Sequence, residues 1–208
     1  LWAMDPGGSL YLLEEDGTLQ KVSSRGWLLW TVQLPTENEA GNLLRYQEMI
    51  CDSSGTLYVS VQEHKRQVDA SGAVQEIILS EEIQAWNSNG EQQNKVLQVD
   101  KTTLSQYSTE PYIRKLQMYG DVLLALCCDQ GQFSVIKTQP YGAQAPVVLA
   151  EYTLEQTANE IEDCASLSDG TLVYSTKGGG LFAISPDGTT QDLGQLAGRQ
   201  TVAGQLSA

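Results

Sequence analysis

Residues 164–193, with the sequence CASLSDGTLVYSTKGGGLFAISPDGTTQDL, contain short apolar runs and turn sequences in regular alternation. The runs Cys164–Leu167, Leu172–Ser175 and Leu181–Ile184 are separated by turns rich in glycine, serine and aspartate. The turn at 185–188, Ser-Pro-Asp-Gly, suits a tight reversal because proline presets φ while aspartate and glycine tolerate positive φ. This pattern predicts a meander of antiparallel strands that ends in a fourth short strand over 189–193.

The same arrangement is repeated along the chain. Each copy opens with a glycine followed by an apolar run, at Gly8, Gly55, Gly120 and Gly170. Each closes with a second turn glycine, at Gly26, Gly72, Gly142 and Gly188. The opening glycines are 47, 65 and 50 residues apart. A period near 50 residues, built from strands and turns without a helical layer, is typical of a propeller.

The fold class predicted is therefore all-β, a propeller-type array of about four four-stranded antiparallel blades that forms part of a larger ring. A four-bladed closed ring is the alternative, since rings of about 4 to 8 blades occur. Residues 1–208 are expected to form one, partial, propeller domain. The repeats are expected near 1–35, 47–79, 113–150 and 163–194, with an insertion over 80–112.

The second repeat is the one whose strands are hardest to place. Its strands are expected over 49–51, 57–61, 67–69 and 74–78. The insertion would follow them, with an extra hairpin over 96–107 and an exposed tip at 87–90. The chain begins at Leu1, inside a predicted strand, which suggests a piece of something longer.

Composition excludes several functions. The formal net charge is −14, and such a surface repels the phosphates of nucleic acids and of anionic lipids. No run of 18 apolar residues exists, so no membrane insertion is expected within this chain. Hydrophobic residues make up 41% of the sequence, which is typical of a globular domain with its own core.

Catalytic and metal-binding motifs are not found. His64 is the only histidine and lies in the polar stretch 63–66, which is expected to be a solvated turn. The four cysteines, Cys51, Cys127, Cys128 and Cys164, include no Cys-x-x-Cys pair and are expected to be buried thiols. A disulfide between Cys127 and Cys128 is the alternative, but neighbouring residues of one strand face opposite ways.

Two Thr-x-Asn-Glu phrases, at 36–39 and 157–160, match a capping box. They predict a single helical turn in each of these connections between repeats.

Several phrases resemble the bacterial propeller repeats of the NHL and PQQ-like families. They are Asp52–Val59, Asp69–Gly72 and Val22–Trp30, the last resembling a PQQ-type blade ending whose tryptophan docks on the next blade. The other repeats lack that tryptophan, which weighs against a quinone-binding ring. The resemblance implies an extracytoplasmic sensory or interaction module of a larger bacterial envelope protein.

The function expected is a non-catalytic binding or sensory module without a cofactor. The alternative is a fragment of a PQQ-type quinoprotein redox enzyme, to which Trp30 and the adjacent Cys127 and Cys128 point. The partner would be a protein or a small-molecule ligand, and a second copy of the chain could complete the ring.

A partner site is expected where the loops between strands two and three meet those between blades. Aromatic and basic residues are common energetic anchors of interfaces, and they stand out on an acidic chain. The predicted site combines the acidic and amide residues Glu37, Asn38 and Glu39 with binding residues His64, Lys65, Arg66, Trp86, Asn87, Tyr112, Arg114 and Lys177.

Overall fold

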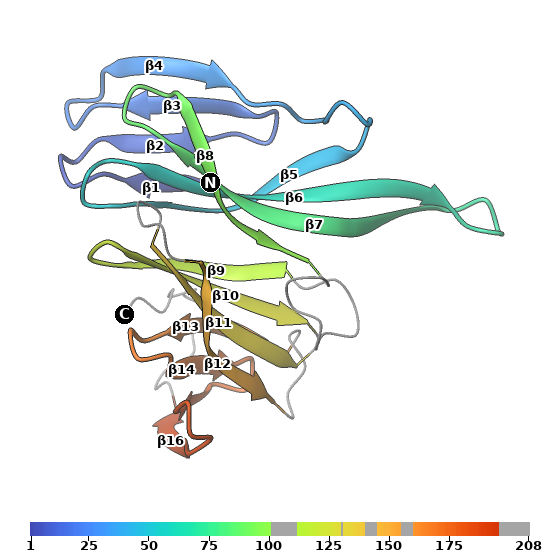
Figure 1. The fold of residues 1–208 in the computed structure, drawn as a ribbon, viewed down its shortest axis with the longest axis vertical. Coiled ribbons are helices and arrows are strands. Elements are labelled where there is room, and N and C mark those ends of the chain that lie inside the picture. The colour runs from blue at the N-terminus through green and yellow to red at the C-terminus, as the bar shows by residue number, and fades with distance from the viewer. Residues whose placement is uncertain (101–111, 130, 140–144, 155–159, 196–208) are drawn as a thin grey trace. The chain divides into compact units, whose positions relative to one another are not determined.

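A computed structural model describes residues 1–100, 112–129, 131–139, 145–154 and 160–195 (Figure 1). These residues form sixteen strands in four antiparallel sheets of four strands each, and no helix. In every sheet the strands follow one another in chain order, so each sheet is a simple meander. The all-β, propeller-type array predicted from the repeats is confirmed.

The chain divides into two compact units, residues 1–113 and 114–208. The first unit contains two sheets. The first sheet comprises β1 (Trp2–Met4), β2 (Leu10–Leu13), β3 (Thr18–Val22) and β4 (Leu28–Gln33). The second sheet comprises β5 (Leu43–Cys51), β6 (Leu57–Val68), β7 (Val74–Trp86) and β8 (Gln92–Val99).

The other two sheets follow in the same manner. The third sheet comprises β9 (Tyr112–Tyr119), β10 (Val122–Asp129), β11 (Gln132–Thr138) and β12 (Val147–Thr153). The fourth sheet comprises β13 (Ile161–Ser166), β14 (Leu172–Thr176), β15 (Gly180–Ile184) and β16 (Thr190–Gln195). The strands expected in the last repeat lie within about three residues of those observed.

The second sheet differs from the sequence-based expectation. Residues 80–99 are not an insertion, because β7 continues to Trp86 and β8 is the fourth strand of the sheet. The expected strand at 74–78 is the beginning of β7, and the expected third strand at 67–69 continues β6. The physical reason is that the turn at 69–72 joins two unusually long strands rather than two short ones. The hairpin expected over 96–107 falls largely outside the described residues.

The capping-box prediction at 36–39 is wrong. The Asn38 side chain accepts hydrogen bonds from the backbone N–H groups of Ala40 and Asn42, which closes a turn. Glu37 then pairs with Leu43 as an isolated β-bridge, so no helical turn forms. Asparagine side chains compete with helical hydrogen bonding in this way. The second phrase, at 157–160, lies almost wholly outside the described residues.

The two sheets of the first unit share one hydrophobic core. Tyr11, Leu13 and Leu19 from the first sheet pack with Leu57, Val59 and Trp86 from the second. Each of these side chains is at most 6% exposed. Full burial of such side chains stabilises a fold by roughly 1.5–3 kcal/mol each.

Two of the glycines that open the repeats also take part in contacts between neighbouring sheets. The Tyr11 hydroxyl donates a hydrogen bond of 2.9 Å to the Gly55 carbonyl, and the Tyr152 hydroxyl donates one of 2.6 Å to the Gly170 carbonyl. Gly55 and Gly170 have φ of 86° and 93°, a conformation that other residues adopt at a cost. The repeat glycine therefore shapes the turn that receives the preceding sheet's tyrosine.

The four cysteines are free thiols, as predicted, but Cys51 is half-buried rather than buried. Cys127 and Cys128 are adjacent on β10, are fully buried and form no disulfide. Burial raises the pKa of Cys51 to about 12 and that of Cys164 to about 11, so neither is activated as a thiolate.

Candidate interaction arm

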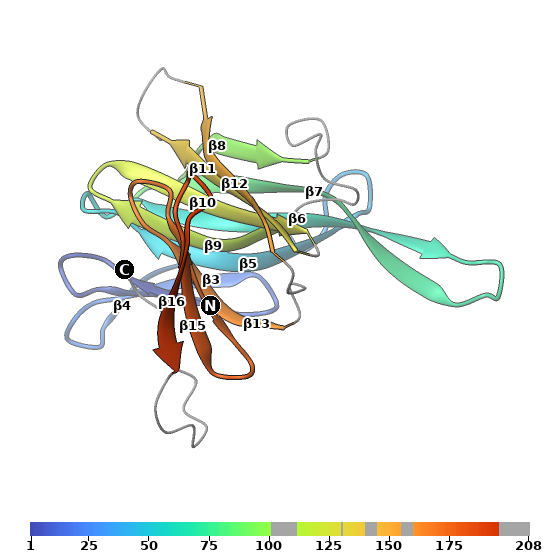
Figure 2. The ribbon, with the colours of Figure 1, turned by 90° about the horizontal axis from the view of Figure 1, so that it is seen from below.

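The β6–β7 hairpin extends well beyond the sheet to which it belongs (Figures 1 and 2). The last pair between β5 and β6 joins Leu43 to His64, and β8 pairs with β7 only from Glu81 onward. Residues 65–77, called the arm below, are therefore a two-stranded ribbon in the described part of the chain.

Local sequence explains why the ribbon forms. The Asp69 carboxylate accepts hydrogen bonds from the backbone N–H groups of Ser71 and Ala73, which fixes the turn at the tip. Val68 then pairs with Val74, and Arg66 with Glu76. Valine has high β propensity, and opposite charges across two strands stabilise their pairing by roughly 0.2–1 kcal/mol.

The arm exposes apolar surface at its tip. Val68 and Val74, which face each other across the ribbon, are 69% and 63% exposed. Nearly all other residues between Lys65 and Ile77 are exposed as well. The apolar tip is thus presented to solvent and contributes little to the core of the unit.

Basic side chains lie at the root of the arm. The Arg45 guanidinium lies 2.7 Å from the Glu76 carboxylate, and Arg66 lies 3.5 Å from the same carboxylate. Hydrogen bonding to Arg45 lowers the pKa of Glu76. One carboxylate thus faces two guanidinium groups. Lys65 forms no ion pair with any described residue, so this region is locally positive.

His64 lies within β6 and not in a turn, which corrects the sequence-based prediction for residues 63–66. Its Nε2 lies 3.0 Å from the Gln62 Oε1. Burial, with a further contribution from Arg45, lowers the pKa of His64. The ring is therefore neutral around pH 7 and adds no charge to the arm.

The base of the arm is fixed to the loop that precedes β5. The Glu63 carboxylate accepts hydrogen bonds from the side-chain amides of Asn38 and Asn42, at 2.7 and 2.6 Å, and from the Ser80 hydroxyl. The hydrogen bond with Asn42 is the largest cause of the lowered pKa of Glu63. This loop thus anchors the ribbon at its root.

A cleft of about 490 Å³ lies beside the root, between the first and second sheets. The residues that line it include Glu14, Glu15, Arg45 and Tyr46. It also borders Leu1, whose ammonium group donates to the Leu13 carbonyl.

Trp86 is not a surface residue, although the sequence placed it in the partner site. Its side chain is 6% exposed and packs in the core of the first unit. Asn87 begins a turn in which its side chain accepts from the backbone N–H groups of Asn89 and Glu91. Trp86 therefore serves the packing of the two sheets, and Asn87 shapes the turn that follows β7.

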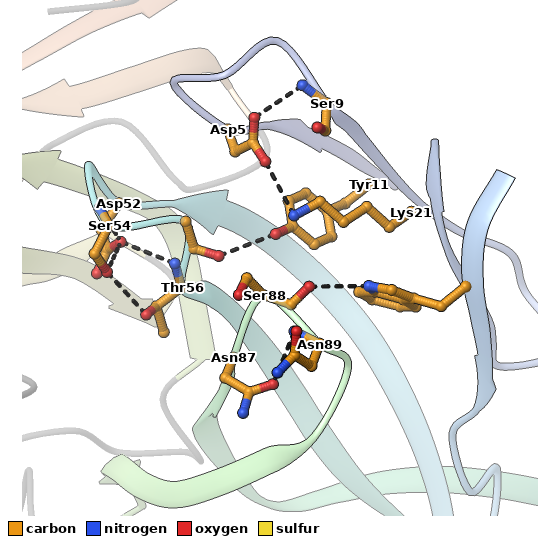
Figure 3. Close-up of polar contacts among 12 residues, drawn as sticks. Asp5, Ser9, Tyr11, Lys21, Asp52, Ser54, Thr56, Asn87, Ser88 and Asn89 are labelled. Atoms are coloured by element: carbon orange, nitrogen blue, oxygen red, sulfur yellow. Dashed lines mark hydrogen bonds and ion pairs between the residues drawn. The ribbon is translucent and has the colours of Figure 1, made fainter. Parts of the chain in front are cut away.

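That turn is where Trp30 docks (Figure 3). The indole Nε1 of Trp30 donates a hydrogen bond of 2.9 Å to the Ser88 carbonyl. The indole also packs edge-on against Tyr11, with ring centroids 5.9 Å apart. The ammonium group of the buried Lys21 lies 4.8 Å from the centre of the Tyr11 ring and pairs with Asp5 at 3.1 Å. The predicted docking of this tryptophan on the next blade is thus present.

The remaining predicted site residues lie elsewhere. Tyr112 is half-buried at the start of β9. Arg114 donates to the Glu162 carbonyl, and the backbone N–H of Lys177 donates to the Glu160 carbonyl, both within the second unit. The structure therefore brings together His64, Lys65 and Arg66, and it adds Arg45, Val68 and Val74, which sequence reasoning missed.

Two observations limit the chemistry of the described residues. No three histidine, cysteine, aspartate or glutamate side chains among them gather closely enough to hold a metal ion. No helix among them is long and apolar enough to cross a membrane.

The described geometry defines an all-β, propeller-type sheet array with a projecting arm. No protein-family model matches this sequence. No curated protein matches it either. Solved structures do resemble it in fold.

One such structure is the complex of KlAtg21 with the coiled-coil of AgAtg16. It aligns with a TM-score of 0.51 and 12% identity, over 89% of this chain and 51% of that one. Another is BamB from Moraxella catarrhalis, at a TM-score of 0.40 and 14% identity, over 94% of this chain and 60% of that one. The chain thus spans between half and two thirds of the length of these structures. The first likeness concerns the fold alone, and the second is too weak to support an argument.

Proposed function

We propose that this chain is a non-catalytic binding module whose β6–β7 arm engages a protein partner. The observation that carries the proposal is the two-stranded ribbon over residues 65–77, which projects beyond β5 and β8. Isolated two-stranded ribbons are at best marginally stable in water. A partner that covers an exposed ribbon with apolar residues at its tip would therefore stabilise it.

The composition of the arm supports a protein partner. Exposed Val68 and Val74 offer apolar contact area, while Arg66 and Arg45 offer charged groups around a single carboxylate. Apolar contacts combined with arginine are typical of protein interfaces. The complex of KlAtg21 with a coiled coil is an instance of a similarly folded protein with a protein partner.

The absence of catalysis is part of the proposal. The only histidine, His64, contacts Gln62 through Nε2, and its Nδ1 has no hydrogen-bond partner among the described residues. The competing function is the quinoprotein enzyme, which the docking of Trp30 on the next blade favours. Incubation with pyrroloquinoline quinone and calcium, followed by gel filtration, separates the two. Stoichiometric retention of quinone absorbance by the protein would favour the enzyme.

The proposal includes an extracytoplasmic location in a larger bacterial envelope protein, with a sensory role. Support for this part comes from the resemblance of the repeats to envelope propeller modules. Fractionation of cells that produce the parent protein tests it directly. Recovery of the protein in the cytoplasmic fraction would contradict the location and leave the role of the arm untouched.

The role of the arm is tested with a variant that lacks it. Replacing residues 65–77 by Asn-Gly joins the paired residues His64 and Ile78 through a two-residue hairpin turn. A displayed library of random twelve-residue peptides is selected on the natural chain and counter-selected on the shortened variant. The proposal predicts families of peptides that need the arm. If no peptide that needs the arm remains after counter-selection, the arm is not the binding element.

A further inference from the structure

One edge of the arm lacks a neighbouring strand. Beyond the Leu43–His64 pair, residues Lys65–Val68 of β6 pair only with β7 among the described residues. In an antiparallel strand, alternate residues direct both N–H and C=O to the same side. Two residues of this segment therefore direct backbone donors and acceptors toward the position where β5 would continue.

The chain itself does not continue β5 along this edge. The preceding residues turn back at 38–41, and the backbone N–H of Leu44 donates to the Thr36 carbonyl. Asn38 and Asn42 hold this loop against Glu63, before the open edge begins.

Side chains along the open edge have a definite chemistry. Lys65 and Arg66 are adjacent and so point to opposite faces of the ribbon. Lys65 has no charged partner among the described residues, and Arg66 shares Glu76 with Arg45. Val68 lies on the same face as Arg66 and is 69% exposed. A strand laid along this edge would thus meet two basic residues and then an apolar one.

We propose that Lys65–Val68 binds an extended acidic segment of a partner protein as an added β-strand. Read antiparallel to β6, the segment carries an apolar residue opposite Val68, any residue opposite Gln67, and acidic residues opposite Arg66 and Lys65. Main-chain hydrogen bonds provide affinity and the side chains provide selectivity. A second copy of this chain is a poorer occupant, because each copy carries a net charge of −14 and the copies repel each other.

This inference rests on the proposed function and identifies its partner class. A fluorescein-labelled peptide with the sequence Thr-Ile-Thr-Glu-Glu-Thr, blocked at both ends, serves as the probe. Its binding is followed by fluorescence anisotropy, and the contacted residues are located from backbone amide shifts in NMR spectra. The expected result is saturable binding, with the largest amide shifts at residues 65–68. Shifts confined to other parts of the chain would overturn the proposal.

Charge reversal tests the side-chain contacts. Lys65→Glu turns an attractive cross-strand pair into a repulsive one and is expected to weaken binding about tenfold. Arg25→Glu is the matched control, since Arg25 is an exposed residue in the turn between β3 and β4 and the change in net charge is identical. Equal weakening by both substitutions would show only long-range electrostatics and would refute a contact at Lys65.

Backbone methylation of the peptide tests strand pairing separately from charge. Two peptides are compared, each N-methylated at alternate residues and differing only in which set is methylated. In an added strand only one set of alternate N–H groups faces the edge of the arm. Methylation of that set is expected to abolish binding, and methylation of the other set is expected to change the affinity by no more than about twofold. Equal affinity of the two peptides would refute strand addition.

Two outcomes separate this inference from the proposed function. If the peptide library yields arm-dependent binders without the apolar-x-acidic-acidic pattern, the partner class is wrong and the role of the arm survives. If no binder depends on the arm, both fail. Concentration-dependent dimers in sedimentation that Lys65→Glu abolishes would identify a second copy as the occupant and overturn the acidic partner.

Discussion

The substitution Glu81→Gln is predicted to remove a pH dependence of the stability of the first unit. Glu81 is completely buried on β7. Its Oε2 accepts hydrogen bonds from the backbone N–H of Ile113, at 2.6 Å, and from the Gln62 side-chain amide, at 3.1 Å. Its Oε1 has no hydrogen-bond partner among the described residues. Burial, opposed by these hydrogen bonds, raises the pKa of Glu81 to about 7.

The direction of the effect follows from proton binding. An unfolded glutamate titrates near 4.5, so between pH 4.5 and 7 the folded state binds the proton more tightly than the unfolded state. The contribution of Glu81 to stability is therefore largest below pH 4.5 and falls as the pH rises through 7. The difference between a pKa of 4.5 in the unfolded state and one of about 7 in the folded state corresponds to about 3 kcal/mol of unfolding free energy. Above pH 7 this contribution is constant, because Glu81 is then ionised in both states.

The assay is urea denaturation at several pH values between 4.5 and 8, followed by tryptophan fluorescence. All four tryptophans lie between residues 2 and 86, so the signal reports the first unit. The stability of Glu81→Gln relative to the natural chain is expected to increase by about 3 kcal/mol across this range. His64 acts in the opposite direction, since its pKa is lowered, but it is present in both proteins and cancels in the difference.

Glu82→Gln is the matched control for the loss of one negative charge. Glu82 follows Glu81 on the same strand, faces the other side of the sheet and pairs with Lys95 at 2.5 Å. The stability of Glu82→Gln relative to the natural chain is not expected to increase with pH as that of Glu81→Gln does. If the curves of Glu81→Gln and the natural chain run parallel from pH 4.5 to 8, Glu81 is ionised throughout and the reasoning from its burial is refuted.

Three further predictions concern the sheet contacts and the thiols. Tyr11→Phe leaves the Gly55 carbonyl without its donor and is expected to lower the unfolding free energy by about 1–3 kcal/mol, measured by urea denaturation; an unchanged midpoint would contradict this. Trp86→Ala empties part of the shared core and should cost about 3–5 kcal/mol; a loss of partner binding with unaltered stability would instead restore Trp86 to a surface site. Thiol titration of denatured, unreduced protein should find close to four reactive groups, and finding none would show two disulfides.

Much of the fold could be predicted because its turns carry strong local signals. Asp52, Asp69 and Asp169 each use the side chain to accept backbone N–H groups just ahead in the chain, and glycines with positive φ complete these turns. Such turns depend on neighbouring residues alone, so the sequence indicates them reliably. They mark where strands end, and they were enough to predict a meander of four strands per repeat.

The arm could not be predicted because strand length is not a local property here. Polar residues at 62–67 interrupt the apolar pattern of β6, and the same composition is typical of a loop. Both faces of the ribbon are exposed, so no period of two appears in the sequence. The available signal was the spacing of the turns: Gly55 and Asp69 are separated by 13 residues, too many for one short strand. The burial of Trp86 depends on the first sheet, which no local pattern reveals.

The second sheet contains three similar turns, and the one at the tip of the arm differs from the other two in its contacts. The turn at 52–56 receives the Tyr11 hydroxyl on the Gly55 carbonyl, and the turn at 87–91 receives the Trp30 indole on the Ser88 carbonyl. The third turn, at 69–73, has the same internal hydrogen bonds, yet no described side chain donates to its carbonyls at 70–72. Two of the turns are thus acceptors for an aromatic donor from the neighbouring sheet. The length of β6 and β7 carries the third turn away from that sheet, and its carbonyls at 70–72 have no side-chain donor among the described residues.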